Sequence, residues 1–313
     1  MEIALVTGGA GFIGSHLCDA LIGKGFKVVC IDNFLTGSKK NIEHLIKNQN
    51  FKFIKDDITN FTDYKLLTSN YLFHLASPAS PVDYQNHPEE TALANSLGTL
   101  NMLKTAVENK AKFLFASTSE VYGNPLVHPQ KETYWGNVNS FGPRSCYDES
   151  KRFAEALAYI YIKKYKLDAR IVRIFNTYGP RMQKDDGRVV SNFINQAIVG
   201  KPLTVYGDGA QTRSFCYVTD LVDGILKAMF SKSTKGEIFN LGNSEEYKII
   251  DLAQKIKSLA SSKSELVFEP LPQDDPTQRK PDIKKAREIL GWEPKVSLDE
   301  GLRKTIDYYK SLL

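Results

Sequence analysis

Short apolar runs bounded by turn residues alternate with longer amphipathic segments through much of the chain. This alternation is typical of a parallel sheet whose two faces are both covered by helices. We expect strands at Ile3–Val6, Lys27–Ile31, Phe51–Ile54, Tyr71–Leu75, Lys112–Ala116, Arg170–Phe175 and Glu237–Leu241. We expect helices at Phe12–Ile22, Glu89–Asn109, Tyr147–Tyr165, Val189–Val199, Thr219–Phe230 and Lys248–Ala260.

The alternation breaks down after Phe175 into loops rich in glycine and proline, such as Tyr178-Gly179-Pro180 and Tyr206-Gly207-Asp208-Gly209. Loops of this kind favour a second, smaller lobe. A chain of 313 residues is also large for one hydrophobic core. We therefore expect a main domain over residues 1–177, to which residues 213–242 return. Residues 178–313 are expected to form most of a C-terminal substrate-binding lobe.

Composition limits the class of protein. Hydrophobic residues make up 42% and charged residues 25%, as in ordinary globular proteins, and the net charge is only +5. Lysine doublets are scattered, so we expect no nucleic-acid partner, although the mild positive balance favours a phosphorylated substrate. We expect no membrane span and no signal peptide. The four cysteines lack CxxC spacing, so we expect reduced thiols, a cytoplasmic location and no metal site.

A glycine-rich turn joins the first expected strand to the first expected helix. Gly8, Gly11 and Gly14 follow Ile3–Val6 directly. In this context they allow a tight turn, close approach of backbone N–H groups to a pyrophosphate, and packing of the helix on the strand. The second strand ends at Asp32, near the ~20-residue offset at which an acid binds the adenosine ribose and repels a 2′-phosphate. The pattern predicts an α/β, Rossmann-type doubly wound sheet that binds NAD rather than NADP.

Tyr147 and Lys151 stand four residues apart in an expected helix. Positions i and i+4 share a helix face, so the ammonium can lie close to the phenol. A free tyrosine has a pKa of about 10, and a nearby positive charge lowers a pKa by roughly 1–3 units. A phenolate tuned in this way can take a proton from a hydroxyl. An isolated pair could merely decorate a helix, but with the glycine turn and Ser117-Thr118-Ser119 it indicates a nicotinamide enzyme acting on an alcohol.

These motifs resemble those of the extended short-chain dehydrogenase/reductase family, and the resemblance covers nearly the whole chain. Longer segments are similar to those of its UDP-glucuronate decarboxylases, namely His74–Pro81, Ser119–Gly123, Arg144–Glu149, Arg173–Arg181 and Gln273–Pro276. The resemblance implies conversion of UDP-glucuronate to UDP-xylose through a 4-keto sugar, with internal recycling of NAD.

The resemblance also assigns residues to the cofactor. Besides the three glycines and Asp32, the implied contacts are Phe12, Ile13, Asn33, Phe34, Thr36, Gly37, Asp57, Ile58, Leu75, Ala76, Ser77, Tyr147 and Lys151. Asp57 follows the third expected strand, and a turn-capping role is an alternative interpretation of it.

For the chemistry, the resemblance implies that Tyr147 is the base and that Lys151 lowers its pKa, while Thr118 and Ser119 orient the substrate's 4-hydroxyl. Sugar 4,6-dehydratases carry Asp-Glu where this chain has Ser119-Glu120. The 4-epimerases usually have no acid at the second position, so the pair disfavours both activities. Glu120 is expected to order the water that protonates C5, the alternative being a helix-capping or salt-bridging acid.

The residues implied at the substrate are Asn176, Arg188, Tyr206, Arg213 and Arg279. Arg213 matches a diphosphate contact, for which a guanidinium is suited because it can engage two phosphate oxygens. A solvated turn is the alternative for Arg188, and an exposed arginine binding nothing is the alternative for Arg279. Leu93 and Ala94 stand where animal members are expected to carry more polar residues, which disfavours a secondary contact there.

Two rival hypotheses share these motifs. An oxidative decarboxylase would release the 4-keto pentose and NADH, whereas a redox-sensing protein would keep the fold without turnover. Such sensors typically lose the tyrosine or the lysine. The expected helices Glu89–Asn109 and Tyr147–Tyr165 are long, and the second spreads apolar residues beyond one stripe, which favours a second buried face. The family pairs these helices between two subunits, so we expect a homodimer.

Overall fold

The computed structural model describes residues 1–60, 68–273, 276 and 278–313. Asp274 and Asp275, which belong to one of the decarboxylase-like segments, lie outside the described residues. Within the described part, no helix is both long and apolar enough to span a membrane.

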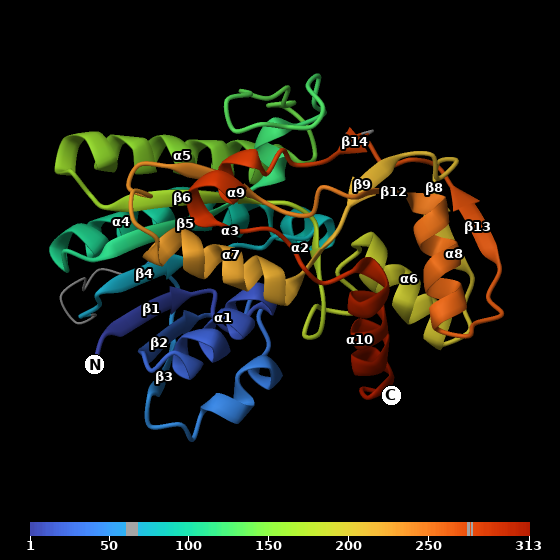
Figure 1. Ribbon diagram of the computed structural model, residues 1–313, viewed down its shortest axis with the longest axis horizontal. Helices are drawn as coiled ribbons and strands as arrows, with labels where there is room; N and C mark the ends of the chain where they lie inside the picture. Colours follow the sequence, from blue (N-terminus) through green and yellow to red (C-terminus); the bar gives the residue numbers. More distant parts are fainter. Residues whose placement is uncertain (61–67, 274–275, 277) are drawn as a thin grey trace.

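A parallel sheet forms the larger part of the molecule (Figure 1). In the described residues it has seven strands in the order β11-β6-β5-β4-β1-β2-β3. These are β1 (Ile3–Thr7), β2 (Lys27–Asp32), β3 (Phe51–Lys55), β4 (Tyr71–His74), β5 (Lys112–Thr118), β6 (Ala169–Ile174) and β11 (Ile238–Leu241). The chain leaves β1 in one direction to β2 and β3 and later returns to its other side, which confirms the predicted doubly wound fold. Ligands of such sheets bind at the carboxyl ends of the strands, where the order reverses.

Helices cover both faces of this sheet (Figure 1). Helices α1 and α7 pack on one face, and α4 and α5 pack on the other. Their bounds are α1 (Phe12–Gly23), α4 (Thr99–Glu108), α5 (Ser145–Tyr165) and α7 (Val218–Phe230). Successive strand residues point to opposite faces, so Ala4 and Val6 join the core under α1 and α7 whereas Leu5 joins the core under α4 and α5. Burial on both faces explains why the strands read as apolar runs rather than alternating patterns.

The helix predicted at Glu89–Asn109 is wrong as a single element. The structure divides it into α3 (Pro88–Leu93), a π-helical turn (Ala94–Gly98) and α4. The turn sets the Asn95 side chain against α5, where its Nδ2 donates to Ser150 Oγ at 3.0 Å. A Cβ on Gly98 would lie 2.6 Å from Ile58 Cδ1. Tertiary packing of this kind is not visible in helical periodicity.

The second lobe contains short sheets and helices at the other end of the molecule (Figure 1). Its helices are α6 (Val189–Ile198), α8 (Ile249–Leu259) and α10 (Leu298–Lys310). Its strands are β8 (Leu203–Tyr206), β9 (Thr212–Ser214), β12 (Glu246–Lys248), β13 (Leu266–Glu269) and β14 (Gln278–Arg279). The sequence-based prediction missed α10, as well as the short helices α2 (Pro81–Asn86) and α9 (Lys284–Leu290). Strand β11 leaves this part of the chain and pairs with β6 in the main sheet.

Candidate functional site

A cavity of about 610 Å³ lies along the carboxyl ends of the strands and is lined by both lobes. Every predicted site residue except Phe34 lines it. Phe34 has a left-handed backbone, with φ of 64°, and its ring packs against Phe53 at 5.0 Å between centroids. The role of Phe34 as a cofactor contact stays a prediction, and its ring lies outside the cavity lining. Its backbone N–H supports the site by donating to Asp32 Oδ1 at 2.8 Å.

The glycine turn packs so closely that side chains at two of its positions would collide with the protein backbone. A Cβ on Gly8 would lie 2.7 Å from Ala76 Cα, and one on Gly14 would lie 2.1 Å from the Gly8 carbonyl oxygen. Helix α1 begins at Phe12, no side chain caps its N-terminus, and its first residues line the cavity. Free N–H groups at a helix N-terminus attract an anion. The turn therefore fits the diphosphate of a dinucleotide.

Two carboxylates line the part of the cavity next to the glycine turn. Asp32 Oδ2 accepts the Ala10 N–H at 3.0 Å. Burial raises the pKa of Asp32, and the N–H groups of Phe34 and Ala10 oppose that rise. Asp57 Oδ1 accepts the N–H and the hydroxyl of Thr59 at 2.8 and 2.7 Å, so its turn-capping alternative is present in the structure.

Helix α5 carries Tyr147 and Lys151 one turn apart, as predicted, but the pKa of Tyr147 does not shift as predicted. Lys151 Nζ lies 5.8 Å from the centre of the Tyr147 ring and donates to the Ala116 carbonyl at 2.8 Å. Burial lowers the pKa of Lys151 to about 7. Burial also raises the pKa of Tyr147, and the hydrogen bond with Thr118 only partly opposes this. The expected lowering of the tyrosine pKa is corrected, because desolvation of both groups outweighs their proximity.

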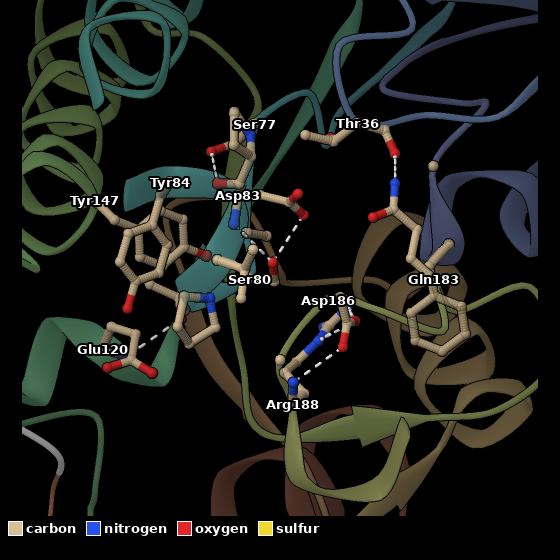
Figure 2. A pocket seen from close by; sticks show the side chains of 18 of the residues that line it. Thr36, Ser77, Ser80, Asp83, Tyr84, Glu120, Tyr147, Gln183, Asp186 and Arg188 are labelled. Atoms are coloured by element: carbon tan, nitrogen blue, oxygen red, sulfur yellow. Dashed lines mark hydrogen bonds and ion pairs between the residues drawn. The ribbon is translucent and has the colours of Figure 1, made fainter. Parts of the chain in front are cut away.

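Glu120 stands near Tyr147 in the cavity (Figure 2) and joins arginines from both lobes. Its carboxylate accepts from Arg144 Nη2 at 2.7 Å and from Arg279 Nη2 at 2.8 Å, with a second contact from Arg279 Nη1. Burial opposes ionisation of Glu120, but Arg279 and Arg144 outweigh it and lower its pKa to about 2. The salt-bridging alternative for Glu120 is thus present. Arg144 was missed as a site residue, although it directly precedes α5 and stands three positions before Tyr147.

Two of the predicted arginines are partners in neighbouring strands. Arg213 in β9 and Arg279 in β14 face one another in a parallel pair. Arg213 Nη1 donates to the Thr212 carbonyl at 2.8 Å, and Nη2 contacts the Pro276 carbonyl. Tyr206 lines the same cavity from the end of β8. The arrangement suits a diphosphate.

Arg188 is held by an acid that the sequence-based prediction did not select. Asp186 is fully buried, and its Oδ2 accepts from Arg188 Nε at 2.8 Å and from Nη2 at 2.6 Å (Figure 2). The alternative of a solvated turn is therefore wrong for Asp186. A buried carboxylate fixes the direction of the guanidinium, which lines the cavity.

Further polar atoms in the cavity wall lack partners within the described residues. Asn176 Nδ2 and Arg279 Nε are buried and have no hydrogen-bond acceptor there. Buried polar atoms are seldom left unpaired, because each costs free energy. Since both residues line the cavity, the wall fits a polar ligand that supplies the acceptors.

Comparison with known proteins identifies the family. A family model described as GDP-mannose 4,6 dehydratase matches residues 5–305. UDP-glucuronic acid decarboxylase 1 of Danio rerio is 53% identical over 97% of this chain and 72% of its own length. UDP-glucuronic acid decarboxylase 1 of Arabidopsis thaliana is 54% identical over 98% of this chain and 69% of its own length.

Solved structures share the fold. A UDP-glucuronic acid 4-epimerase from Bacillus cereus, in complex with UDP-glucuronic acid and NAD, is 34% identical with a TM-score of 0.91 and covers 99% of this chain and 100% of its own. A UDP-glucose 4-epimerase from Thermotoga maritima, with UDP-glucose, is 33% identical with a TM-score of 0.90 and covers 99% of both chains. The chain therefore belongs to the UDP-glucuronic acid decarboxylase family, within the extended short-chain dehydrogenases/reductases.

Proposed function

We propose that the chain decarboxylates UDP-glucuronate to UDP-xylose through a UDP-4-keto sugar, with NAD as its cofactor. The observation that carries the proposal is the Glu120 cluster, in which two buried arginines meet one carboxylate beside Tyr147. Both guanidinium groups line the cavity, and a guanidinium is suited to a carboxylate acceptor. A sugar with a carboxylate of its own therefore suits this part of the wall, and the family to which the chain belongs supports the same substrate.

NAD, held by the glycine turn and Asp32, would take the hydride from C4 and later return it, which no side chain can do. Tyr147 takes the proton of the 4-hydroxyl, and Thr118 and Ser119 orient that hydroxyl. Once C4 is a ketone, the C6 carboxylate is β to a carbonyl. The electron pair of the C5–C6 bond then passes into an enolate as CO₂ leaves. Water protonates C5, and Tyr147 returns its proton to the C4 oxygen when the hydride comes back.

Glu120 does not act as a proton donor in this scheme. With a pKa of about 2 it remains a carboxylate at neutral pH. A carboxylate can hold the two arginines and orient a water molecule by accepting its hydrogen bond. A dehydratase needs an acid to protonate a leaving hydroxyl, so the ionised state of Glu120 favours decarboxylation over dehydration.

The net redox balance tests the proposal. Because the hydride leaves C4 and returns to it, incubation with UDP-glucuronate and NAD⁺ is expected to yield UDP-xylose without stoichiometric NADH, measured by chromatography and by absorbance of NADH. Equimolar NADH and UDP-4-keto-pentose would instead identify an oxidative decarboxylase. UDP-galacturonate would identify an epimerase, and absence of turnover would favour a nucleotide-binding protein.

We also infer that two copies pair through α5 and the helical segment formed by α3, the π-helical turn and α4. Large apolar side chains remain exposed there, including Phe153 at 52%, Ile160 at 48% and Leu97 at 41%. Residues from α3 and the π-helical turn pack against α5, so the two segments form one continuous surface. An apolar surface of this kind is typical of a subunit interface.

Light scattering at micromolar concentration is expected to give the mass of a dimer. Phe153→Glu combined with Ile160→Glu is expected to shift the protein toward monomer, because each change buries a charge in the interface. A matched pair of substitutions at exposed apolar residues elsewhere, Val267→Glu and Phe268→Glu in β13, should leave the mass unchanged. A monomeric mass for the unaltered protein would overturn the inference.

The state of the thiols supports an inference about the compartment. All four cysteines lie in described parts of the chain and are free. We infer a reducing, cytoplasmic environment, for which free buried thiols are the ordinary state.

A further inference from the structure

Tyr84, in the short helix α2, lies against the proposed base. Its ring stacks on that of Tyr147 with 5.0 Å between centroids and 8° between planes (Figure 2). Only 1% of Tyr84 is exposed, yet it lines the cavity. Tyr84 therefore belongs to the wall against which a bound sugar would rest.

The Tyr84 hydroxyl has no hydrogen-bond partner within the described residues, although it is buried. The backbone of Tyr84 is held on two sides. Its N–H donates to the Ser80 carbonyl at 3.0 Å, and its carbonyl accepts from Cys146 Sγ at 3.4 Å. A buried hydroxyl without a partner costs free energy, and an anchored residue cannot easily turn to recover it.

Buried tyrosines away from the cavity behave differently. The Tyr122 hydroxyl, which is equally buried, donates to Asn240 Oδ1 at 2.8 Å and accepts from Arg173 Nη1 at 2.9 Å. The fold can thus satisfy a buried phenol where the role is structural. The unpaired Tyr84 hydroxyl points to a partner that arrives with a ligand.

The charges around Tyr84 indicate what that partner is. The hydroxyl is influenced by the charges of Glu120, Arg144 and Asp148, and the Arg144 guanidinium lies 6.0 Å from the centre of the ring. Burial raises the pKa of Tyr84, so the phenol is protonated at neutral pH and can donate a hydrogen bond. The Arg144 guanidinium beside this donor is suited to an anionic acceptor, against the opposing charges of Glu120 and Asp148.

We propose that the Tyr84 hydroxyl donates a hydrogen bond to the uronate carboxylate of the bound nucleotide sugar. This inference rests on the proposed function and adds a residue that recognises the carboxylate which the reaction removes. Arg144 and Arg279 contribute charge to the same subsite, and Tyr84 contributes a neutral donor at a fixed position. The product, a pentose without that carboxylate, makes no such bond.

Tyr84→Phe tests the proposal, because it keeps the ring and its stacking on Tyr147 but removes the hydroxyl. The dissociation constant for UDP-glucuronate, measured by calorimetry, is expected to rise about tenfold to a hundredfold, as for a lost hydrogen bond to a charged group. The constants for UDP-xylose and UDP are expected to stay within about twofold, because neither ligand has the carboxylate. The melting temperature is expected to remain equal or to rise, since no hydrogen bond within the protein is lost.

Tyr122→Phe is the matched control. It removes a buried hydroxyl that has protein partners, so it should lower the melting temperature and leave the UDP-glucuronate constant unchanged. Unchanged affinity of Tyr84→Phe for UDP-glucuronate would overturn the inference. An equal loss for all three ligands, or a fall in melting temperature like that of Tyr122→Phe, would overturn it too. Failure of the unaltered protein to turn over UDP-glucuronate would instead count against the proposed function.

Discussion

Tyr147→Phe is expected to lower the turnover of UDP-glucuronate by about 10²- to 10⁴-fold, the range typical of losing a general base. The substitution keeps the aromatic ring, and with it the stacking on Tyr84. It removes the oxygen that takes the proton from the 4-hydroxyl. The first oxidation should therefore fail, so no absorbance of NADH should appear in a single-turnover experiment. Binding of UDP and of NAD is expected to persist, because the residues that hold them are unchanged.

Tyr178→Phe serves as its control. The Tyr178 hydroxyl is also buried and donates to the Leu298 carbonyl at 3.3 Å, but Tyr178 does not line the cavity. Its loss should reduce stability without a comparable loss of turnover. If Tyr147→Phe retained more than about a tenth of the turnover, another residue would have to be the base.

Glu120→Ala is expected to stop the reaction at a later stage. Tyr147, Lys151 and the cofactor residues remain in place, so oxidation at C4 can still proceed. Without the carboxylate, water at C5 is no longer oriented and Arg144 and Arg279 lose their shared partner. Stopped-flow absorbance is expected to show enzyme-bound NADH that decays slowly while release of the pentose product is delayed. Removing one partner of a buried ion pair also costs about 3–5 kcal/mol of stability, so the melting temperature should fall.

The stability effect can be separated from the chemical effect. Asp168→Ala removes the carboxylate 2.7 Å from Arg170 Nη2, a buried arginine outside the cavity lining. That variant should also melt earlier but should show no NADH accumulation. Unimpaired turnover by Glu120→Ala would reduce Glu120 to an acid that merely joins the two lobes.

The main sheet could be predicted because each strand is buried on both faces. Short apolar runs between turn residues, such as Lys27–Ile31 and Lys112–Ala116, are typical of parallel strands that helices cover on both faces. The break at Ala94–Gly98 could not be predicted, because it depends on contacts with Ile58 and Ser150, which are distant in the sequence. Helix α10 was missed although Leu298, Leu302 and Ile306 repeat at helical spacing and are buried. The signal for α10 was present in the sequence.

The parts of the candidate site that depend on local sequence spacing could be predicted. The glycine turn and the Tyr147/Lys151 pair depend on local spacing, and the structure brings both to one cavity. Arg144 and Asp186 were missed because their roles depend on partners that only the fold brings near. The direction of the tyrosine pKa was wrong for a related reason. Spacing shows that two groups are close, but it does not show how deeply both are buried.

Glu120 draws its two counter-ions from different halves of the chain, and this limits how the enzyme can be recombined. A chimaera that joined residues 1–177 to the C-terminal portion of an epimerase would keep Arg144 and replace Arg279 with whatever residue the donor carries at that point. One of the two ion pairs that keep Glu120 ionised would then depend on the donor's residue. Functional hybrids should consequently be those in which β14 and the Ser119-Glu120 segment come from the same parent. The two lobes therefore cannot be exchanged independently. A crossover point chosen from the strand order alone would separate Glu120 from Arg279.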